Sequence, residues 1–179
     1  PALTVIQADL DTTRTWATWV FTGFLLTSAV STPIVGKLGD IYGKKRLMVV
    51  ALVAFAVGTV AAALSTSIEL LIAARAVQGV GGAVFPLAFG IVRDELPPER
   101  VGVGLGLLSA TFGVGGGAGL VLSGVILDTA AWQWLFWLGA IPVVIALVLL
   151  ILLVPESPVR TRSQIDWWGA DAERYVFRQ

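Results

Sequence analysis

A single arginine interrupts a long apolar segment of this chain. Arg75 is the only charged residue between positions 70 and 92, and Gln78 follows it one helical turn later. An arginine inside a lipid-spanning helix costs about 2.5–3.5 kcal/mol on insertion scales, so such residues usually face protein or a water-filled cavity. Gln78 and Gly79 share its helical face. The spacing favours a polar face that points into a bundle. The alternative is that the long Arg75 stem reaches the outer headgroups.

A second set of charges lies in the short segment 36–46. Asp40 is its only anion and precedes Lys44 by four residues. Lys44 is followed by two further cations at a point where the dipole of the next helix disfavours positive charge. Membrane topology alone would explain these cations, but it does not explain Asp40. We predict a cytoplasmic cluster of Asp40, Lys44 and Asp94, the last of which ends the apolar segment that holds Arg75.

The apolar stretches between these charges have the length of membrane spans. The uncharged stretches 15–36 and 47–68 are each about 22 residues long, and roughly 20 apolar residues cross a bilayer as a helix. Lipid offers no partners to backbone groups, so each span must be helical. Pro86 and Pro142 fall inside spans and are expected to kink them. Flanking charges mark five spans: 16–35, 48–66, 70–92, 101–127 and 132–154.

Composition agrees with a multi-pass membrane protein. The 179 residues are 56% hydrophobic and 13% charged, with a mean hydropathy of +0.86. The net charge of +0 gives no basic field for nucleic acid. The chain has no Cys and no His, and it shows no nucleophile–base pair or phosphate loop. We therefore expect no cofactor, no metal site and no enzyme activity.

The distribution of cations predicts the orientation. Basic residues concentrate on the cytoplasmic side of membrane proteins, which places loops 36–47, 93–100 and 155–166 there. Only Arg14 falls on the opposite side. Tryptophans cluster near the span ends and are interpreted as interfacial anchors: Trp16, Trp19, Trp132, Trp134, Trp167 and Trp168. The cations on the predicted cytoplasmic side are Lys37, Lys44, Lys45, Arg46, Arg93, Arg100, Arg160 and Arg162.

The fourth span is unusually rich in glycine. Gly115, Gly119 and Ser123 are spaced by four residues and form one smooth face, and Gly113 and Gly117 form another beside it. Small residues at such spacing allow close approach between helices. The pattern predicts a helix that packs tightly on two sides or must bend, and ordinary close packing without a moving role is the alternative.

Together these residues resemble the major facilitator superfamily, and most of all its fourteen-helix drug:proton antiporters. The segment 36–46 resembles the signature loop between the second and third helices through Gly36, Leu38, Asp40, Gly43, Lys44, Lys45 and Arg46. The fourth-helix motif is matched by Arg75, Gln78 and Gly79, and the fifth-helix antiporter motif by Gly115, Gly119, Ser123 and Gly124. Two departures stand out, because Leu120 replaces the usual proline of the antiporter motif and Ile41 replaces a frequent arginine.

The resemblance implies an all-α membrane bundle that forms most of one six-helix half of such a transporter. Residues 1–170 would run from the end of the first helix to beyond the sixth, and residues 171–179 read as a non-membrane tail. Asp40, Lys44 and Asp94 would form a cytoplasmic charge relay. Arg75 and Gln78 would lie on the proton-coupling or substrate pathway, and the span at 115–124 would serve exchange.

The implied function is proton-coupled export of small amphipathic or cationic molecules across the cell (inner) membrane by alternating access. The partners would be the substrate, protons, the lipid bilayer and a missing C-terminal half or partner chain. No residue of this chain is identified as the proton carrier. Two other hypotheses remain open: a membrane fragment that cannot transport alone, and an uptake symporter of the same superfamily, which Leu120 favours.

Overall fold

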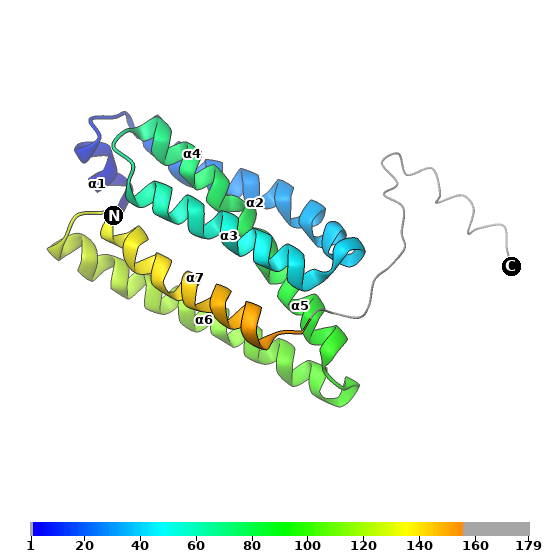
Figure 1. The fold of residues 1–179 in the computed structure, drawn as a ribbon. Helices are drawn as coiled ribbons and strands as arrows, with labels where there is room; N and C mark the ends of the chain where they lie inside the picture. Colours follow the sequence, from blue (N-terminus) through cyan, green and yellow to red (C-terminus); the bar gives the residue numbers. More distant parts are fainter. Residues whose placement is uncertain (1, 156–179) are drawn as a thin grey trace, which may run out of the picture.

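The structure is a computed structural model that describes residues 2–155, and this part of the chain is helical throughout apart from short connections. Figure 1 shows the helices running side by side along one long axis. In chain order the elements are α1 (Ala2–Asp9), α2 (Arg14–Tyr42), α3 (Lys44–Ala63), α4 (Ile68–Gly79), the 3-10 turn η1 (Val80–Ala83), α5 (Val84–Glu95), α6 (Pro98–Thr129) and α7 (Trp134–Leu153).

The described residues form five helical stretches long and apolar enough to cross a membrane. They are Arg14–Tyr42, Lys44–Ala63, Ile68–Glu95, Pro98–Thr129 and Trp134–Leu153. Large apolar side chains face outward from them, as expected where lipid is the solvent. The prediction of an all-α, multi-pass membrane bundle is confirmed. The tail at 171–179, Trp167 and Trp168 lie outside the described residues, as does nearly all of segment 155–166.

Local chemistry sets the helix ends. The Thr13 hydroxyl accepts a hydrogen bond from the Trp16 backbone N–H at 3.4 Å, and the Ser67 hydroxyl accepts one from the Leu70 N–H at 3.3 Å. Each hydroxyl satisfies one of the N–H groups that a helix start leaves without a partner. Pro98 begins α6, where its missing N–H costs nothing.

The segment 36–46 is not a loop, contrary to the expectation from sequence. Helix α2 continues to Tyr42 and α3 begins at Lys44, so Gly43 alone joins them. Gly43 has φ 112°, a conformation that side chains with a Cβ rarely adopt. The three cations from Lys44 to Arg46 therefore form the first turn of α3 instead of preceding it. Charge suggested a loop, but the backbone needs only one glycine to reverse direction.

The third predicted span is interrupted in its middle. Helix α4 ends at Gly79, the chain tightens into η1, and α5 carries it on to Glu95. Pro86 explains the break, because it has no N–H for the carbonyl of Gly82 and its ring crowds that carbonyl. Helix α7, in contrast, continues through Pro142.

Two groups of helices differ in how they pack. Helix α2 lies along α4, α3 contacts both, and α7 packs against α3 (Figure 1). Buried side chains from α1 to α4 gather around Trp132 of the α6–α7 connection. Helix α6 contacts α5, α1 and α7 sparsely, and none of its residues is buried. We call the end of the bundle that holds Gly43 the basic end, and the opposite end, which holds Trp132, the tryptophan end.

Candidate functional site

Arg75 points into the bundle and contacts two neighbouring helices, α2 and α7. Its Nε donates a hydrogen bond to the backbone oxygen of Val20 in α2 at 3.3 Å. Its guanidinium lies 4.4 Å from the ring centre of Phe24 in α2 and 5.9 Å from that of Phe136 in α7, at distances where aromatic faces attract cations. In this conformation the Arg75 side chain contacts α2 and α7 and does not reach toward the headgroups.

Gln78 connects Arg75 to α3. Its side-chain oxygen accepts a hydrogen bond from Nη1 of Arg75, and its Nε2 donates to Oγ1 of Thr59 at 2.8 Å. The Thr59 hydroxyl in turn donates to the backbone oxygen of Phe55 at 2.7 Å. Gln78 is 4% exposed and Thr59 is 2% exposed. A buried polar network of this kind is stable only when its members are paired. Here the amide oxygen and nitrogen of Gln78 and the hydroxyl of Thr59 all form hydrogen bonds.

No carboxylate lies within ion-pair distance of Arg75 among residues 2–155. Its charge is compensated by a carbonyl oxygen, an amide oxygen and two aromatic rings. These groups stabilise the cation less than an anion would. The guanidinium is thus held by two of its five N–H donors, Nε–H and one on Nη1.

Glycines allow α2, α3 and α4 to approach closely enough for this hydrogen-bond network. A Cβ at Gly79 would come within 2.6 Å of the Phe24 backbone oxygen, and a Cβ at Gly58 within 2.6 Å of the Gln78 backbone nitrogen. Both are backbone contacts that cannot move aside. Gly79, which the sequence places on the Arg75 face, lies at such a close approach, whereas sequence reasoning missed Gly58.

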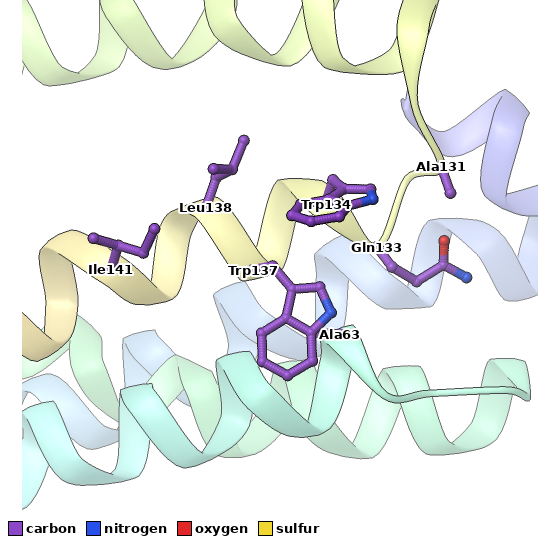
Figure 2. A pocket seen from close by; sticks show the side chains of 7 residues that line it. All are labelled: Ala63, Ala131, Gln133, Trp134, Trp137, Leu138 and Ile141. Carbon is purple, nitrogen blue, oxygen red and sulfur yellow. The ribbon is translucent and has the colours of Figure 1, made fainter.

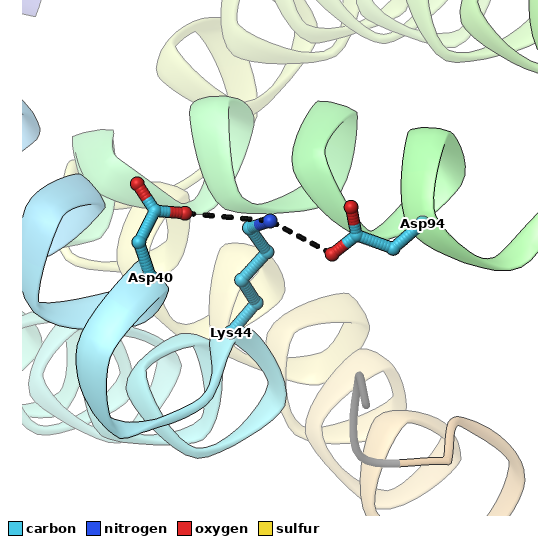
Figure 3. Close-up of polar contacts among 3 residues, drawn as sticks. All are labelled: Asp40, Lys44 and Asp94. Atoms are coloured by element: carbon cyan, nitrogen blue, oxygen red, sulfur yellow. Dashed lines mark hydrogen bonds and ion pairs between the residues drawn. The ribbon is translucent and has the colours of Figure 1, made fainter. Parts of the chain in front are cut away.

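The second cluster lies at the basic end. Nζ of Lys44 donates a hydrogen bond to Oδ2 of Asp94 at 2.7 Å and forms an ion pair with Oδ1 of Asp40 at 3.3 Å, as Figure 3 shows. The side chains of Lys44 and Asp94 are each 13% exposed, against 48% for Asp40. The structure thus brings together the three residues expected in one cluster, and it joins α2, α3 and α5 through them.

The other residues of the signature segment have different environments. A Cβ at Gly39 would meet Leu87 and Lys44, but one at Gly36 would meet no atom of residues 2–155 within 4 Å. Gly36 therefore sits on a more open part of α2 than Gly39. Leu38 is half-buried and Arg46 is exposed. Nζ of Lys45 donates to the Ile151 backbone oxygen at 3.1 Å, a link to the last turn of α7 that sequence reasoning missed.

The glycines of α6 from Gly113 to Gly124 are not packed against other helices in the described part of the chain. A Cβ at Gly115, Gly119 or Gly124 would meet no atom within 4 Å among the described residues. In the described part of the chain, the hydroxyl of Ser123 bonds only within its own helix, to the Leu120 backbone oxygen at 2.8 Å. Tight packing on two sides of α6 is therefore not seen among residues 2–155, and it stays a prediction. A small-residue stripe permits close approach, but it does not supply a neighbour.

The tryptophan end contains one residue whose role was misjudged. Trp132 was interpreted as an interfacial anchor, yet it is 1% exposed and its Nε1 donates to Oδ2 of Asp9 at 2.7 Å. Trp16, Trp19 and Trp134 are exposed, in agreement with anchoring. Position near a span end does not distinguish these two environments, because the contact partner of Trp132 lies more than 100 residues away.

An open apolar pocket lies along the first half of α7, next to the end of α3 and the α6–α7 connection. Its volume is about 730 Å³, and two tryptophans dominate its wall (Figure 2). The lining residues are Ala63, Ala131, Gln133, Trp134, Trp137, Leu138 and Ile141. Its size and lining resemble those of sites for small apolar molecules.

Comparison with known proteins identifies the family. A model of the Major Facilitator Superfamily matches residues 1–177. Multidrug resistance protein 3 of Bacillus subtilis is 35% identical over 166 residues, which are 92% of this chain and 32% of that protein. An efflux pump of Dothistroma septosporum is 33% identical over 175 residues, 94% of this chain and 30% of the pump. An uncharacterized transporter of Bacillus subtilis is 36% identical over 171 residues, 94% and 33% of the two chains.

The chain spans about a third of the length of these curated relatives. The family match covers nearly every residue, and it agrees with a bundle of membrane-spanning helices without strands in the described part. The chain belongs to the major facilitator superfamily of membrane transporters.

Proposed function

We propose that this chain is part of a transporter that exports small amphipathic or cationic molecules in exchange for protons. The observation that carries the proposal is Arg75, a half-buried cation held by hydrogen bonds inside a membrane bundle, with no carboxylate in ion-pair distance among residues 2–155. Buried ionisable groups in membrane spans mark substrate and proton pathways. The names of two relatives, a multidrug resistance protein and an efflux pump, favour export.

The basic-end cluster supports an alternating-access mechanism. Lys44 ties α2 and α5 together through two carboxylates, so separating these helices would break a partly buried pair. We propose that this relay stabilises the outward-facing state and lies on the cytoplasmic side of the cell membrane. That orientation rests on the excess of basic residues at this end. The substrate would bind between this half and a second one, supplied by the rest of the polypeptide or by a partner chain.

Transport into proteoliposomes tests the proposal. The complete polypeptide encoded by the gene would be reconstituted with a pH-sensitive dye inside the vesicles, and ethidium would serve as a lipophilic cation probe. With an acidic interior, an antiporter accumulates the cation while protons leave, so the interior becomes alkaline faster when the probe is present. Absence of probe-dependent flux across a panel of lipophilic cations would contradict the proposal.

An uptake symporter is the second candidate. Leu120 stands where the antiporter motif has proline, and its side chain is 78% exposed. The same vesicles distinguish the two functions, because a symporter accumulates its substrate when the interior is alkaline. We expect the 179-residue chain alone to insert without transporting, since one half supplies only one wall of the substrate site.

A further inference from the structure

The Arg75 network contains one residue that nothing in the sequence marked, which is Thr59 of α3. Its hydroxyl has a single hydrogen, and that hydrogen is used in the bond to the Phe55 backbone oxygen at 2.7 Å. Toward Gln78 the hydroxyl can therefore only accept a hydrogen bond. It does so from Nε2 of Gln78 at 2.8 Å.

This arrangement fixes which end of the Gln78 amide faces Arg75. With the NH2 group directed to Thr59, the amide oxygen is directed to the guanidinium, which has only donors. The reversed amide would place its NH2 group against the guanidinium donors on one side, and its oxygen against the Thr59 oxygen, whose hydrogen is already used, on the other. Gln78 is only 4% exposed, so without the Thr59 acceptor its Nε2 would have no hydrogen-bond partner. Nothing on the α3 side would then hold the amide in this orientation.

The geometry of Arg75 depends on that orientation. Its Nε donates to Val20 of α2 on one side, and its Nη1 donates to Gln78 on the other. Two bonds in different directions fix the plane of the guanidinium beside the Phe24 ring. If Gln78 turns, one of the two bonds is lost and the group can rotate about its stem.

We propose that Thr59 is a positioning residue of the transport site, which orients the Arg75 guanidinium by fixing the direction of the Gln78 amide. This inference rests on the proposed function, because it assigns Thr59 a role in the coupling that we attribute to Arg75. It concerns a hydroxyl on a different helix from Arg75, and Thr59 contacts Arg75 only through Gln78.

The test compares Thr59→Val with Thr59→Ser in the complete polypeptide. Valine keeps the shape but removes the acceptor, whereas serine keeps it. Thr111→Val in α6 is the matched control, because the Thr111 hydroxyl makes the same bond within its helix, to the Leu107 backbone oxygen at 2.9 Å. Among residues 2–155 it accepts no hydrogen bond from a second side chain. Thr59→Ala replaces Thr59→Val if the latter does not fold.

Two measurements are made: transport in lipid vesicles, and NMR in lipid nanodiscs. In the transport assay we expect Thr59→Val to lower kcat about tenfold, as the loss of one buried hydrogen bond allows, with KM for ethidium nearly unchanged. In 15N NMR of the arginine side chains, the Arg75 guanidinium should rotate slowly in the wild type and faster in Thr59→Val. Thr59→Ser and Thr111→Val should match the wild type in both.

The outcomes separate the two proposals. If the wild type transports, Arg75→Ala does not, and Thr59→Val behaves like the wild type, the role of Thr59 is refuted while the proposed function stands. An equal loss in Thr59→Ser, or in Thr111→Val, would also refute it. Absence of transport in the wild type would overturn the proposed function and the transport role of Thr59, and the NMR comparison would still decide whether Thr59 orients Arg75.

Discussion

The glycines of α3 and α4 lie at close contacts between helices, whereas those in the second half of α6 have no neighbour among the described residues. Around Gly79 and Gly58 the backbones of α2, α3 and α4 approach so closely that an added Cβ would overlap main-chain atoms. Along α6, from Gly113 to Gly124, an added Cβ would meet nothing among the described residues. Helix α4 contains one glycine and α6 contains nine, so the number of glycines in a helix does not show how closely its neighbours pack. The contrast also locates the ordered polar site on the packed side.

The largest expected effect on stability comes from replacing one glycine by alanine in the packed region and one in α6. Gly58→Ala should destabilise the fold by up to about 3 kcal/mol, because overpacking against an immovable backbone has that cost. Gly117→Ala in α6 should stabilise it by as much as about 1 kcal/mol, the helix preference of alanine over glycine. Thermal unfolding of the 179-residue chain in detergent, followed by circular dichroism, measures both. Equal destabilisation by the two changes would show that α6 is packed after all.

The basic end provides the next contrast. Asp94→Asn removes the charge that Lys44 contacts at 2.7 Å and should destabilise the fold by about 2 kcal/mol, as hydrogen bonds to charged groups contribute. Glu99→Gln, in the first turn of α6, should change stability by only a few tenths of a kcal/mol through the helix dipole. Chemical unfolding in detergent compares the two variants. A similar small loss for both would mean that the Lys44 cluster holds no helices together.

A smaller effect is expected at the tryptophan end. Trp132→Phe removes the hydrogen bond to Asp9 but keeps an aromatic ring in the core, so it should cost about 1 kcal/mol. Trp134→Phe, at a side chain that is 51% exposed, should be nearly neutral. The shift in the thermal midpoint relative to the wild type gives both values. If the order is reversed, Trp132 does not anchor the α6–α7 connection.

The smallest effect is expected within the antiporter motif itself. Ser123→Ala removes a hydroxyl that bonds only to its own helix, so stability should change by less than about 0.5 kcal/mol. The same thermal measurement applies. A loss above 1 kcal/mol would reveal a partner for this face of α6 and would remove the contrast with α4.

The fold was largely predictable from the sequence because the membrane simplifies the problem. Apolar length and flanking charge sufficed to identify five spans, since lipid leaves helices as the only option. Two features were not predicted: the one-residue junction at Gly43 and the 3-10 turn before Pro86. Charged residues indicate which part of the chain is in contact with water, but they do not indicate the residue at which a helix ends.

The candidate site was predictable only in part. Arg75, Gln78, Asp40, Lys44 and Asp94 stood out because polar and charged residues are rare in this chain. Thr59 and Gly58 did not, because small and weakly polar residues are common in membrane helices and their role depends on the neighbouring helix. The environment of α6 was unpredictable for the same reason, since its sequence describes only one side of a contact.

Transport by Arg75→Ala in the complete polypeptide tests the central claim most directly. The claim is that the cation held between α2 and α4 couples substrate movement to proton movement. We expect this variant to insert and fold in vesicles yet to lose ethidium-driven proton flux under an imposed pH gradient. Flux equal to that of the wild type, with insertion intact, would show that Arg75 only supports the packing of the bundle.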